Sequence, residues 1–552
     1  MSSRTVQIPF EVENFFRDIA RKSNRSGGKR NRMLAFTYEF YPNSFERCFA
    51  RVLKIPVHID IVTSPHNKST RSTHRYNLWH ANWKGTFHPK LICLMSGGEV
   101  IAGLGSSNLT SGGLQENLEA WSFSRDSGFL SGVRAFLKAL AKKNIVSPRV
   151  CMDEFLALLP QRSPKAVFST LDGDLMGHVI GRLSGPVKRL DIISPIHGDP
   201  ASVIEKLKSK IKGVKVCLHT DDAAIPEIKG ITEYKRLKRP DVWEEERRSI
   251  GRVHAKLYAF HSGRRVDLFW GSANLSRSAW LRSDATANIE LLAHSSVGKE
   301  EWIRFIKSPL PGHKWVKMKP SGGNFLTNDR TIIGWRLLNA VWENRKLYLI
   351  ASGDKALNLQ IRIPGTKTST KCHLRFKNQE AGLSFKASEV LGFTASACPN
   401  SLEWRREGNK EWRTIPVNNL DIAPDGTVFE TLTDRLYWEF ACKPLPGRAG
   451  PPKGSYDYLT DEILLPEEEE LAISDHQGAF DRFVLEWHAV VKRMGQAAHS
   501  NKKLLYQFTS KIKQDIEKNV AAEPGMWPGY KVKFINKLLK EGLKGKWESQ
   551  KK

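Results

Sequence analysis

One short pattern occurs twice in this chain, and the repeat constrains the fold more than any other feature of the sequence. Each copy begins with His-x-Lys, continues through an apolar segment, a glycine-containing turn and a second apolar segment, and closes on Gly-Ser-x-Asn. The interval from His to Asn is 108 − 88 = 20 residues in one copy and 274 − 254 = 20 in the other. Equal intervals predict two similar halves of a single site. The repeated residues are His88, Lys90 and Asn108 in the first copy and His254, Lys256 and Asn274 in the second.

The residue types of the repeat suit phosphate chemistry. Alternate side chains of a β-strand share a face, so His and Lys two residues apart point the same way. A hairpin return brings the Gly-Ser-x-Asn segment beside them. Lysine then neutralises a phosphate, Asn and Ser donate hydrogen bonds to it, and imidazole attacks phosphorus or transfers a proton. A single His-x-Lys is usually only a half-exposed strand edge, but a second copy at the same interval favours a catalytic pair.

Each copy also carries a serine and a glutamate with supporting roles. Ser106 and Ser272 stand two residues before the asparagines, and Glu119 and Glu290 follow the histidines by 31 and 36 residues. A carboxylate there can bond the far ring nitrogen of a histidine and fix its tautomer. We therefore expect these four residues to support the site.

The two stretches resemble the HxK…GSxN motifs of the phospholipase D superfamily. Residues 271–280 are especially similar to the second motif of its tyrosyl-DNA phosphodiesterase branch, and the resemblance covers roughly Asn31–Ala293. It implies a duplicated phospholipase D-like α/β/α sandwich with both His-x-Lys groups across one pseudo-two-fold cleft. It also implies a covalent phosphohistidine intermediate, with His88 as the nucleophile and His254 as the acid and base, although the residues alone do not separate the two roles.

The sequence departs from the commoner HKD form of that superfamily, in which an aspartate follows the histidine by seven residues. Met95 and His261 occupy those positions here. The aspartate is also absent from the tyrosyl-DNA phosphodiesterase branch and from several nuclease branches, so its absence points away from lipid-cleaving members. Bacterial members with this layout resemble nucleases of restriction or phage-defence systems, which leads us to expect an antiviral role and leaves room for partner proteins.

The charge of the chain favours a polyanionic partner. It has 86 Lys and Arg against 58 Asp and Glu, a net charge of +28. Such an excess is typical of proteins that bind nucleic acid, with an anionic membrane as the second alternative. We expect a nucleic acid, DNA rather than RNA, as the substrate.

Several further features narrow the class of protein. Seven scattered cysteines without a CxxC pair argue for a reducing, cytoplasmic location rather than a disulfide or zinc framework. Neither a secretory signal nor a membrane span is visible. Asp, Glu and His form no cluster with metal-ligand spacing, so we expect no cofactor and no metal, with the two lysines supplying positive charge.

The chain divides into four predicted regions. Residues 1–160 and 161–310 are the phospholipase D-like halves, because strand, helix and strand alternate in both before the His-x-Lys segment. Residues 325–445 are an antiparallel β domain, expected to form a sandwich, and 455–552 a basic helical C-terminal region. The expected elements are parallel strands 34–40 and 57–63 around helix 43–53, parallel strands 190–193 and 214–218 around helix 201–211, and a mostly helical segment 128–159.

Aromatic and basic residues are interleaved in the predicted loops before the two motifs. This mixture suits base stacking and contacts to the phosphate backbone. The alternative, equally supported, is that Trp79 and Trp83 pack as hydrophobic lids. The candidate nucleic-acid-binding residues are Trp79, Trp83, Lys84, Lys235, Arg236 and Lys238.

Together these features predict a metal-independent phosphodiesterase that cleaves nucleic acid. Three alternatives stay open: an end-processing enzyme like tyrosyl-DNA phosphodiesterase, a lipid phosphodiesterase, and a catalytically inactive nucleic-acid-binding subunit. The intact motifs in both copies argue against the last.

Overall fold

The protein is described by a computed structural model. The backbone groups into two compact units, Met1–Ile361 with Thr370–Asp425, and Arg362–Ser369 with Gly426–Lys552. Almost every described residue belongs to the first unit, so the predicted helical C-terminal region lies outside the described residues. These are 11–18, 31–49, 57–65, 76–161, 164–221, 225–238, 253–307, 314–321, 336–352, 357–363, 369–374, 386–389 and 401–420, except for positions 13, 111, 197, 285, 345 and 411.

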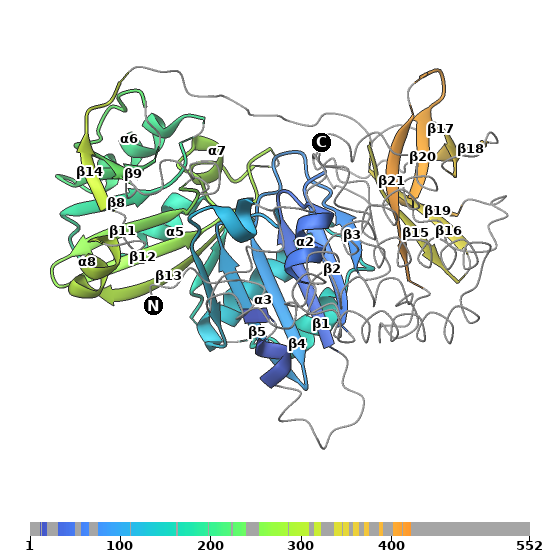
Figure 1. Ribbon diagram of the computed structural model, residues 1–552, viewed down its shortest axis with the longest axis horizontal. Helices are drawn as coiled ribbons and strands as arrows, with labels where there is room; N and C mark the ends of the chain where they lie inside the picture. The colour runs from blue at the N-terminus through green and yellow to red at the C-terminus, as the bar shows by residue number, and fades with distance from the viewer. Residues whose placement is uncertain are drawn as a thin grey trace, which may run out of the picture. The chain divides into compact units, whose positions relative to one another are not determined.

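The first half is built on a mixed six-stranded sheet in the order β3-β2-β1-β4-β5-β6 (Figure 1). The first three strands of the chain are parallel to one another, and the next three are antiparallel to their neighbours. The predicted parallel pair, here β1 and β2, is confirmed, and so is the hairpin return, since the turn at Gly97 and Gly98 folds β4 back into β5. The strands are β1 (Asn31–Thr37), β2 (Val57–Thr63), β3 (Asn77–His80), β4 (Leu91–Ser96), β5 (Glu99–Gly105) and β6 (Trp121–Ser124).

The second half contains an eight-stranded sheet in which the same succession recurs. Its order is β14-β10-β9-β8-β11-β12-β13-β7. The six strands β10-β9-β8-β11-β12-β13 have the same spatial order and the same parallel and antiparallel pairings as β3-β2-β1-β4-β5-β6 in the first half. β14 pairs with β10 and β7 with β13 at the two edges. The strands are β7 (Val167–Ser169), β8 (Arg189–Ile193), β9 (Lys215–Thr220), β10 (Glu233–Lys238), β11 (Leu257–Ser262), β12 (Arg265–Gly271), β13 (Leu291–Gly298) and β14 (Lys314–Met318).

Three of the described helices, α3, α5 and α6, begin at an aspartate that caps unpaired backbone N–H groups. Asp126, Asp174 and Asp199 each cap a helix by accepting from backbone amides of its first turn. None of the described helices is long and apolar enough to span a membrane. The helices of the two halves are α2 (Pro42–Cys48), α3 (Ser127–Lys142), α4 (Met152–Leu158), α5 (Leu175–Ile180), α6 (Pro200–Lys210), α7 (Arg277–Trp280) and α8 (Lys299–Lys307).

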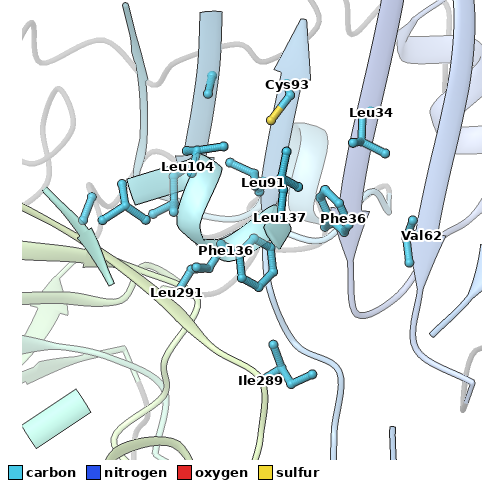
Figure 2. Close-up of a cluster of buried hydrophobic side chains, with 14 of the residues drawn as sticks. Leu34, Phe36, Val62, Leu91, Cys93, Leu104, Phe136, Leu137, Ile289 and Leu291 are labelled. Carbon is cyan, nitrogen blue, oxygen red and sulfur yellow. The ribbon is translucent and has the colours of Figure 1, made fainter. Parts of the chain in front are cut away.

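The two halves share one hydrophobic core. Leu91 and Phe36 from the first half belong to the same buried cluster as Ile289 and Leu291 from the second, with Phe136 of α3 among them (Figure 2). Burial of large apolar side chains is the main favourable term in folding. The sheets are therefore fixed to one another beneath the segments that carry the repeated motif.

A third, seven-stranded sheet follows in the order β18-β17-β20-β21-β15-β16-β19. Gly408, with φ of 90°, lies in the turn that joins β20 to antiparallel β21. The prediction of an antiparallel sandwich fails in part, since β15 is parallel to β21 and the described strands form a single sheet. They are β15 (Arg336–Glu343), β16 (Lys346–Ser352), β17 (Leu357–Arg362), β18 (Thr370–Leu374), β19 (Lys386–Glu389), β20 (Ser401–Arg406) and β21 (Arg413–Asn419).

Two asparagine side chains of this third sheet bind the outer edge of β3. The Asn418 amide donates to Leu78 O and its carbonyl accepts from Leu78 N, both at 2.9 Å. Asn339 Oδ1 accepts from His80 N at 3.0 Å. The backbone groups that an edge strand would expose are thus satisfied by side chains of another sheet.

The predicted elements agree with the structure best where apolar residues dominate. β2 matches the predicted strand 57–63, whereas β1 begins and ends three residues before the predicted strand 34–40. The segments expected to be loops before each motif contain β3 and β10. β3 was missed because its polar Asn77 is satisfied internally by Asp60, and β10 because only Tyr234 and Leu237 of its six residues are buried.

Candidate active site

Each His-x-Lys segment ends where a central strand of its sheet begins. Lys90 directly precedes β4 and Lys256 directly precedes β11. The glycine that opens each Gly-Ser-x-Asn segment lies beside them, because Gly105 N donates to Lys90 O at 3.1 Å and Gly271 N to Lys256 O at 3.3 Å. The hairpins therefore bring the two ends of each motif together.

Both motif glycines are required by close packing. A Cβ atom on Gly105 would lie 2.3 Å from the Trp121 ring. A Cβ atom on Gly271 would lie 2.1 Å from the Leu291 carbonyl oxygen and 3.0 Å from Leu104 of the other half. Real Cβ atoms do not approach this closely, so only glycine lets the strand ends meet.

Two short backbone bridges cross between the halves at the motifs. Phe87 pairs in parallel with Ile289, and Leu118 with Val253. The amide of His88 donates to Ile289 O, as does the amide of residue 254 to Leu118 O, both at 3.0 Å. Each bridge therefore places the histidine of one half directly beside the glutamate of the other.

Each catalytic candidate histidine is held by a carboxylate from the opposite half. His88 Nδ1 lies 2.9 Å from Glu290 Oε2, and His254 Nδ1 lies 2.6 Å from Glu119 Oε1. The motif serines donate to the same carboxylates, both at 2.5 Å, with Ser272 on Glu290 and Ser106 on Glu119. With Nδ1 on the carboxylate, Nε2 is the ring nitrogen that can approach phosphorus.

The two lysines bring buried positive charge to the same place. Lys90 and Lys256 are both 0% exposed. Lys90 Nζ donates to the His88 carbonyl at 3.0 Å, while Lys256 Nζ donates to the His254 carbonyl at 2.7 Å and lies 2.9 Å from His254 Nε2. Burial lowers the pKa of Lys90 to about 8, although nearby Glu290, Glu119 and Glu39 oppose the shift. Burial likewise holds the pKa of Lys256 well below its usual range, and Glu119 and Glu290 oppose this.

The surroundings shift the pKa values of the two glutamates in opposite directions. Burial raises the pKa of Glu290 to about 8, against the opposing effects of Lys90 and Ser272. Burial also disfavours charge on Glu119, but His254 and Lys256 outweigh it and lower the pKa of Glu119. Burial and the Lys256 ammonium lower the pKa of His254 below its ordinary value. The site is therefore symmetric in its residues but not in its charges.

Residues outside the predicted site set contact one motif asparagine, one motif histidine and one motif glutamate. Asn108 Nδ2 donates to Glu39 Oε2 at 3.4 Å, and the Tyr38 ring lies 5.2 Å from the His88 ring, centroid to centroid. Asn288 Nδ2 donates to Glu290 Oε1 at 3.2 Å. Tyr38 and Glu39 could have been found from their position directly after β1, because ligand-binding residues of α/β sheets gather at the ends of parallel strands. The Oδ1 atoms of Asn108 and Asn274 are buried without a partner among the described residues.

The candidate nucleic-acid-binding residues fall into two groups. The Trp79 indole is 0% exposed and donates to Asp60, and Trp83 is 6% exposed and donates to Ala287 O. Their burial favours the packing alternative. The cations of the group lie at the surface, with Lys84, Arg236 and Lys238 exposed and Lys235 half-buried.

The fold brings together two groups of potential metal ligands that have no metal-ligand spacing in the sequence. One is His58, Asp60 and Cys151, and the other is Asp191, Cys217 and His219. The Asp191 carboxylate already accepts from four side chains. They are Arg189 at 2.8 Å, His261 at 2.8 Å, His219 at 3.2 Å and Trp302 at 3.2 Å. Neither group includes a residue of the repeated motif, so metal-independence stays a prediction.

Three solved structures are similar to part of the chain. A mutant of yeast tyrosyl-DNA phosphodiesterase is 14% identical, with a TM-score of 0.34 over 52% of this chain and 89% of that chain. The unmutated yeast enzyme is 14% identical, with a TM-score of 0.33 over 48% and 84%. Polyphosphate kinase from Porphyromonas gingivalis is 12% identical, with a TM-score of 0.34 over 51% and 43%.

The other two comparisons add no relative. No protein-family model matches the chain, and no curated protein matches its sequence. TM-scores near 0.34 do not establish a shared fold. What the chain itself provides is a mixed α/β architecture with two similarly ordered sheets, and eight motif residues, four from each half, that hydrogen bonds hold around the two His–Glu pairs.

Proposed function

We propose that this protein is a phosphodiesterase that cleaves nucleic acid through a covalent phosphohistidine intermediate. The observation that carries the proposal is the crossed arrangement of the histidines, each bonded through Nδ1 to the glutamate of the other half. Two buried lysines adjoin them. We further propose that the halves are duplicated copies of a phospholipase D-like unit, related by a pseudo-two-fold axis through this site.

In the first step, Nε2 of one histidine attacks phosphorus and the bond to the leaving oxygen breaks. The other histidine gives its proton to that oxygen. Lys90, Lys256, Asn108 and Asn274 stabilise the charge that develops on the remaining phosphate oxygens. The nitrogen–phosphorus bond now holds one end of the substrate.

In the second step, the histidine that lost its proton takes one from water. The resulting hydroxide attacks phosphorus, the nitrogen–phosphorus bond breaks, and the first histidine is restored. The carboxylates on Nδ1 hold both rings in one tautomer and stabilise the imidazolium that forms in each step.

The motif resemblance assigns the nucleophile to His88 and the acid and base to His254. The lowered pKa of His254, caused by burial and by the Lys256 ammonium, keeps this ring neutral in the free site. A bound phosphate anion beside Lys256 and Glu119 would raise that pKa. Binding of the substrate would thus charge the acid that the first step needs.

The net charge of +28 supports a nucleic acid as the substrate. The resemblance of residues 271–280 to the tyrosyl-DNA phosphodiesterase motif favours DNA over RNA. The missing motif aspartate counts against a lipid, and the intact motifs count against an inactive subunit. End-processing of a protein–DNA adduct stays a second candidate on the strength of the motif at 271–280. A role in restriction or phage defence, with partner proteins, and a cytoplasmic location stay predictions.

The proposal predicts cleavage of labelled DNA that persists in excess chelator, because the two lysines supply the charge a metal would otherwise bring. The measurement is gel analysis of single- and double-stranded DNA and RNA, a 3′-tyrosyl oligonucleotide and phosphatidylcholine vesicles, each with and without chelator. His88→Ala protein prepared identically is the control for contaminating nucleases. Activity on vesicles alone, or activity lost in chelator, would contradict the proposal.

The buried lysine predicts a descending limb in the pH profile. Because the pKa of Lys90 is lowered to about 8, its ammonium loses its proton as the pH rises through that value. Stabilisation of the substrate anion is then lost, so kcat/KM should fall above about pH 8. The pKa of Glu290 is also raised to about 8, and Glu290 opposes the lowering of the Lys90 pKa, so in Glu290→Gln a limb that belongs to Lys90 should remain and move to lower pH. A profile that stays flat from pH 7 to pH 9.5 in the unaltered protein would refute this assignment.

A further inference from the structure

The edge of the second-half sheet formed by β10 and β14 is strongly cationic. We call its Lys and Arg side chains the basic edge, namely Lys235, Arg236 and Lys238 on β10 and Lys314 and Lys317 on β14. All of them are exposed except Lys235, which is half-buried. β14 lies 314 − 238 = 76 residues beyond β10, so the sequence alone gave no sign that these groups are neighbours.

The register of the two strands sets like charges directly opposite one another. Lys238 faces Lys314, and Lys235 faces Lys317. Like charges at opposing positions of an antiparallel pair destabilise it. Glu233 lies 3.7 Å from Lys235 and offsets part of that repulsion at one end of the ladder. A bound polyanion would offset more of the repulsion along the ladder.

Protection of an open sheet edge does not account for the basic edge. Lysines on an outermost strand discourage pairing with other chains, and this explanation suits β14. β10, however, is an inner strand between β9 and β14, and it carries three of the five cations. Those three need another explanation, and a ligand supplies one.

The basic edge belongs to the same sheet as the second His-x-Lys. One row of cross-strand neighbours runs through Leu257, Ile193, His219, Lys235 and Lys317, on strands β11, β8, β9, β10 and β14. The row therefore connects the residue that follows the catalytic lysine to the outer edge of the sheet.

Strand direction then decides which cations lie toward the site. β8, β9 and β10 are parallel, while β11 and β14 run against their neighbours. Residues that precede Leu257 and Lys317 therefore lie at the same end of the sheet as residues that follow Lys235. Lys238 and Lys314 share that end with His254.

The separation along the sheet fits a nucleic-acid strand. β10 is three strands from β11, which at about 4.8 Å per strand is roughly 14 Å. Phosphates of one stacked strand are roughly 3.4 Å apart along the axis, so the span corresponds to about four nucleotides. We infer that the basic edge binds the phosphate backbone of the substrate strand about four nucleotides from the bond that is cleaved. This inference rests on the proposed function and adds the path of the strand to it.

The test is the salt dependence of binding, which needs no catalysis. A fluorescent 20-nucleotide single strand is titrated with the full chain and with Lys238→Gln/Lys314→Gln protein at several salt concentrations. Each phosphate contact contributes about 0.7 to the slope of log affinity against log salt for single strands, so the slope should fall by roughly 1.4. The matched control is Lys142→Gln/Lys143→Gln at the end of α3, which removes two exposed charges elsewhere.

Cleavage of short and long substrates gives a second readout. A dinucleotide cannot reach the basic edge, so its kcat/KM should be unchanged in the double variant, whereas the KM for the 20-nucleotide strand should rise several-fold. Equal slopes in the double variant and the control would overturn the inference while cleavage by the unaltered protein still stood. A reduced slope in the double variant, together with no cleavage by the unaltered protein, would support phosphate binding by the basic edge and contradict the proposed function.

Discussion

Replacement of either motif histidine by alanine should reduce turnover of a nucleic-acid substrate by at least about a thousandfold. One variant lacks the nucleophile and the other lacks the group that donates and accepts the proton, and proton transfer alone is worth roughly 10² to 10⁴ in rate. Each histidine is bonded to a glutamate of the opposite half, so each variant removes one of the two histidines of a single active site. Single-turnover cleavage of a labelled oligonucleotide measures the effect for His88→Ala and His254→Ala.

The two variants should also differ in what accumulates. If His88 is the nucleophile, a slow acid and base such as His254→Asn should leave a phosphohistidine adduct on residue 88, visible by mass spectrometry of protein quenched at neutral pH. His178→Ala, on α5 outside the site, is the control and should keep full activity. Retention of full turnover by both His88→Ala and His254→Ala would rule out the two-histidine mechanism, and an adduct on His254 in the reciprocal His88→Asn variant would reverse the roles.

The largest effect on stability is expected at Asp191, far from the repeated motif. Burial opposes its charge, yet hydrogen bonds from His219, His261 and Arg189 hold its pKa far below the ordinary range. Asp191→Asn removes the anion that these donors share, and leaving partners of a buried ion pair uncompensated typically costs roughly 3 to 5 kcal/mol. Urea denaturation at pH 7 should show a loss of this size.

A matched exposed aspartate separates this effect from a general loss of charge. Asp284 also accepts from an arginine, Arg282, but its side chain is 53% exposed. Surface pairs contribute little, so Asp284→Asn should change the free energy of unfolding by less than about 1 kcal/mol. Should the two variants unfold at the same urea concentration, the buried network around Asp191 would have no special role in stability.

The sequence revealed the repeat but not how its parts meet. The equal His-to-Asn intervals predict two hairpins with the same ends, and the strand orders of the two sheets agree with this. The sequence did not predict that each histidine is bonded to the glutamate of the other half. This pairing depends on the backbone bridges between Phe87 and Ile289 and between Leu118 and Val253. Contacts between distant segments of a chain leave no periodic trace in either one.

Composition led to the wrong prediction that the segments before the motifs are loops. Interleaved aromatic and basic residues look alike whether they face solvent or form a strand, so the burial of Trp79 in β3 and the exposure of Arg236 in β10 had to come from the sheets. Tyr38 and Glu39 were missed for a different reason. They have no counterpart in the second copy of the motif, and the repeat was the only guide to the site.

The asparagines that bind β3 have a consequence for how this molecule could be divided. A side-chain amide occupies the backbone N–H and C=O of Leu78 but, unlike a strand, carries no row of backbone groups that a further strand could join. It therefore ends lateral growth of the sheet where another strand would invite more. A fragment that ends before β15 would expose the outer edge of β3, and copies of the fragment would tend to aggregate by pairing through that edge. The third sheet thus keeps the edge of β3 from pairing with other copies of the chain.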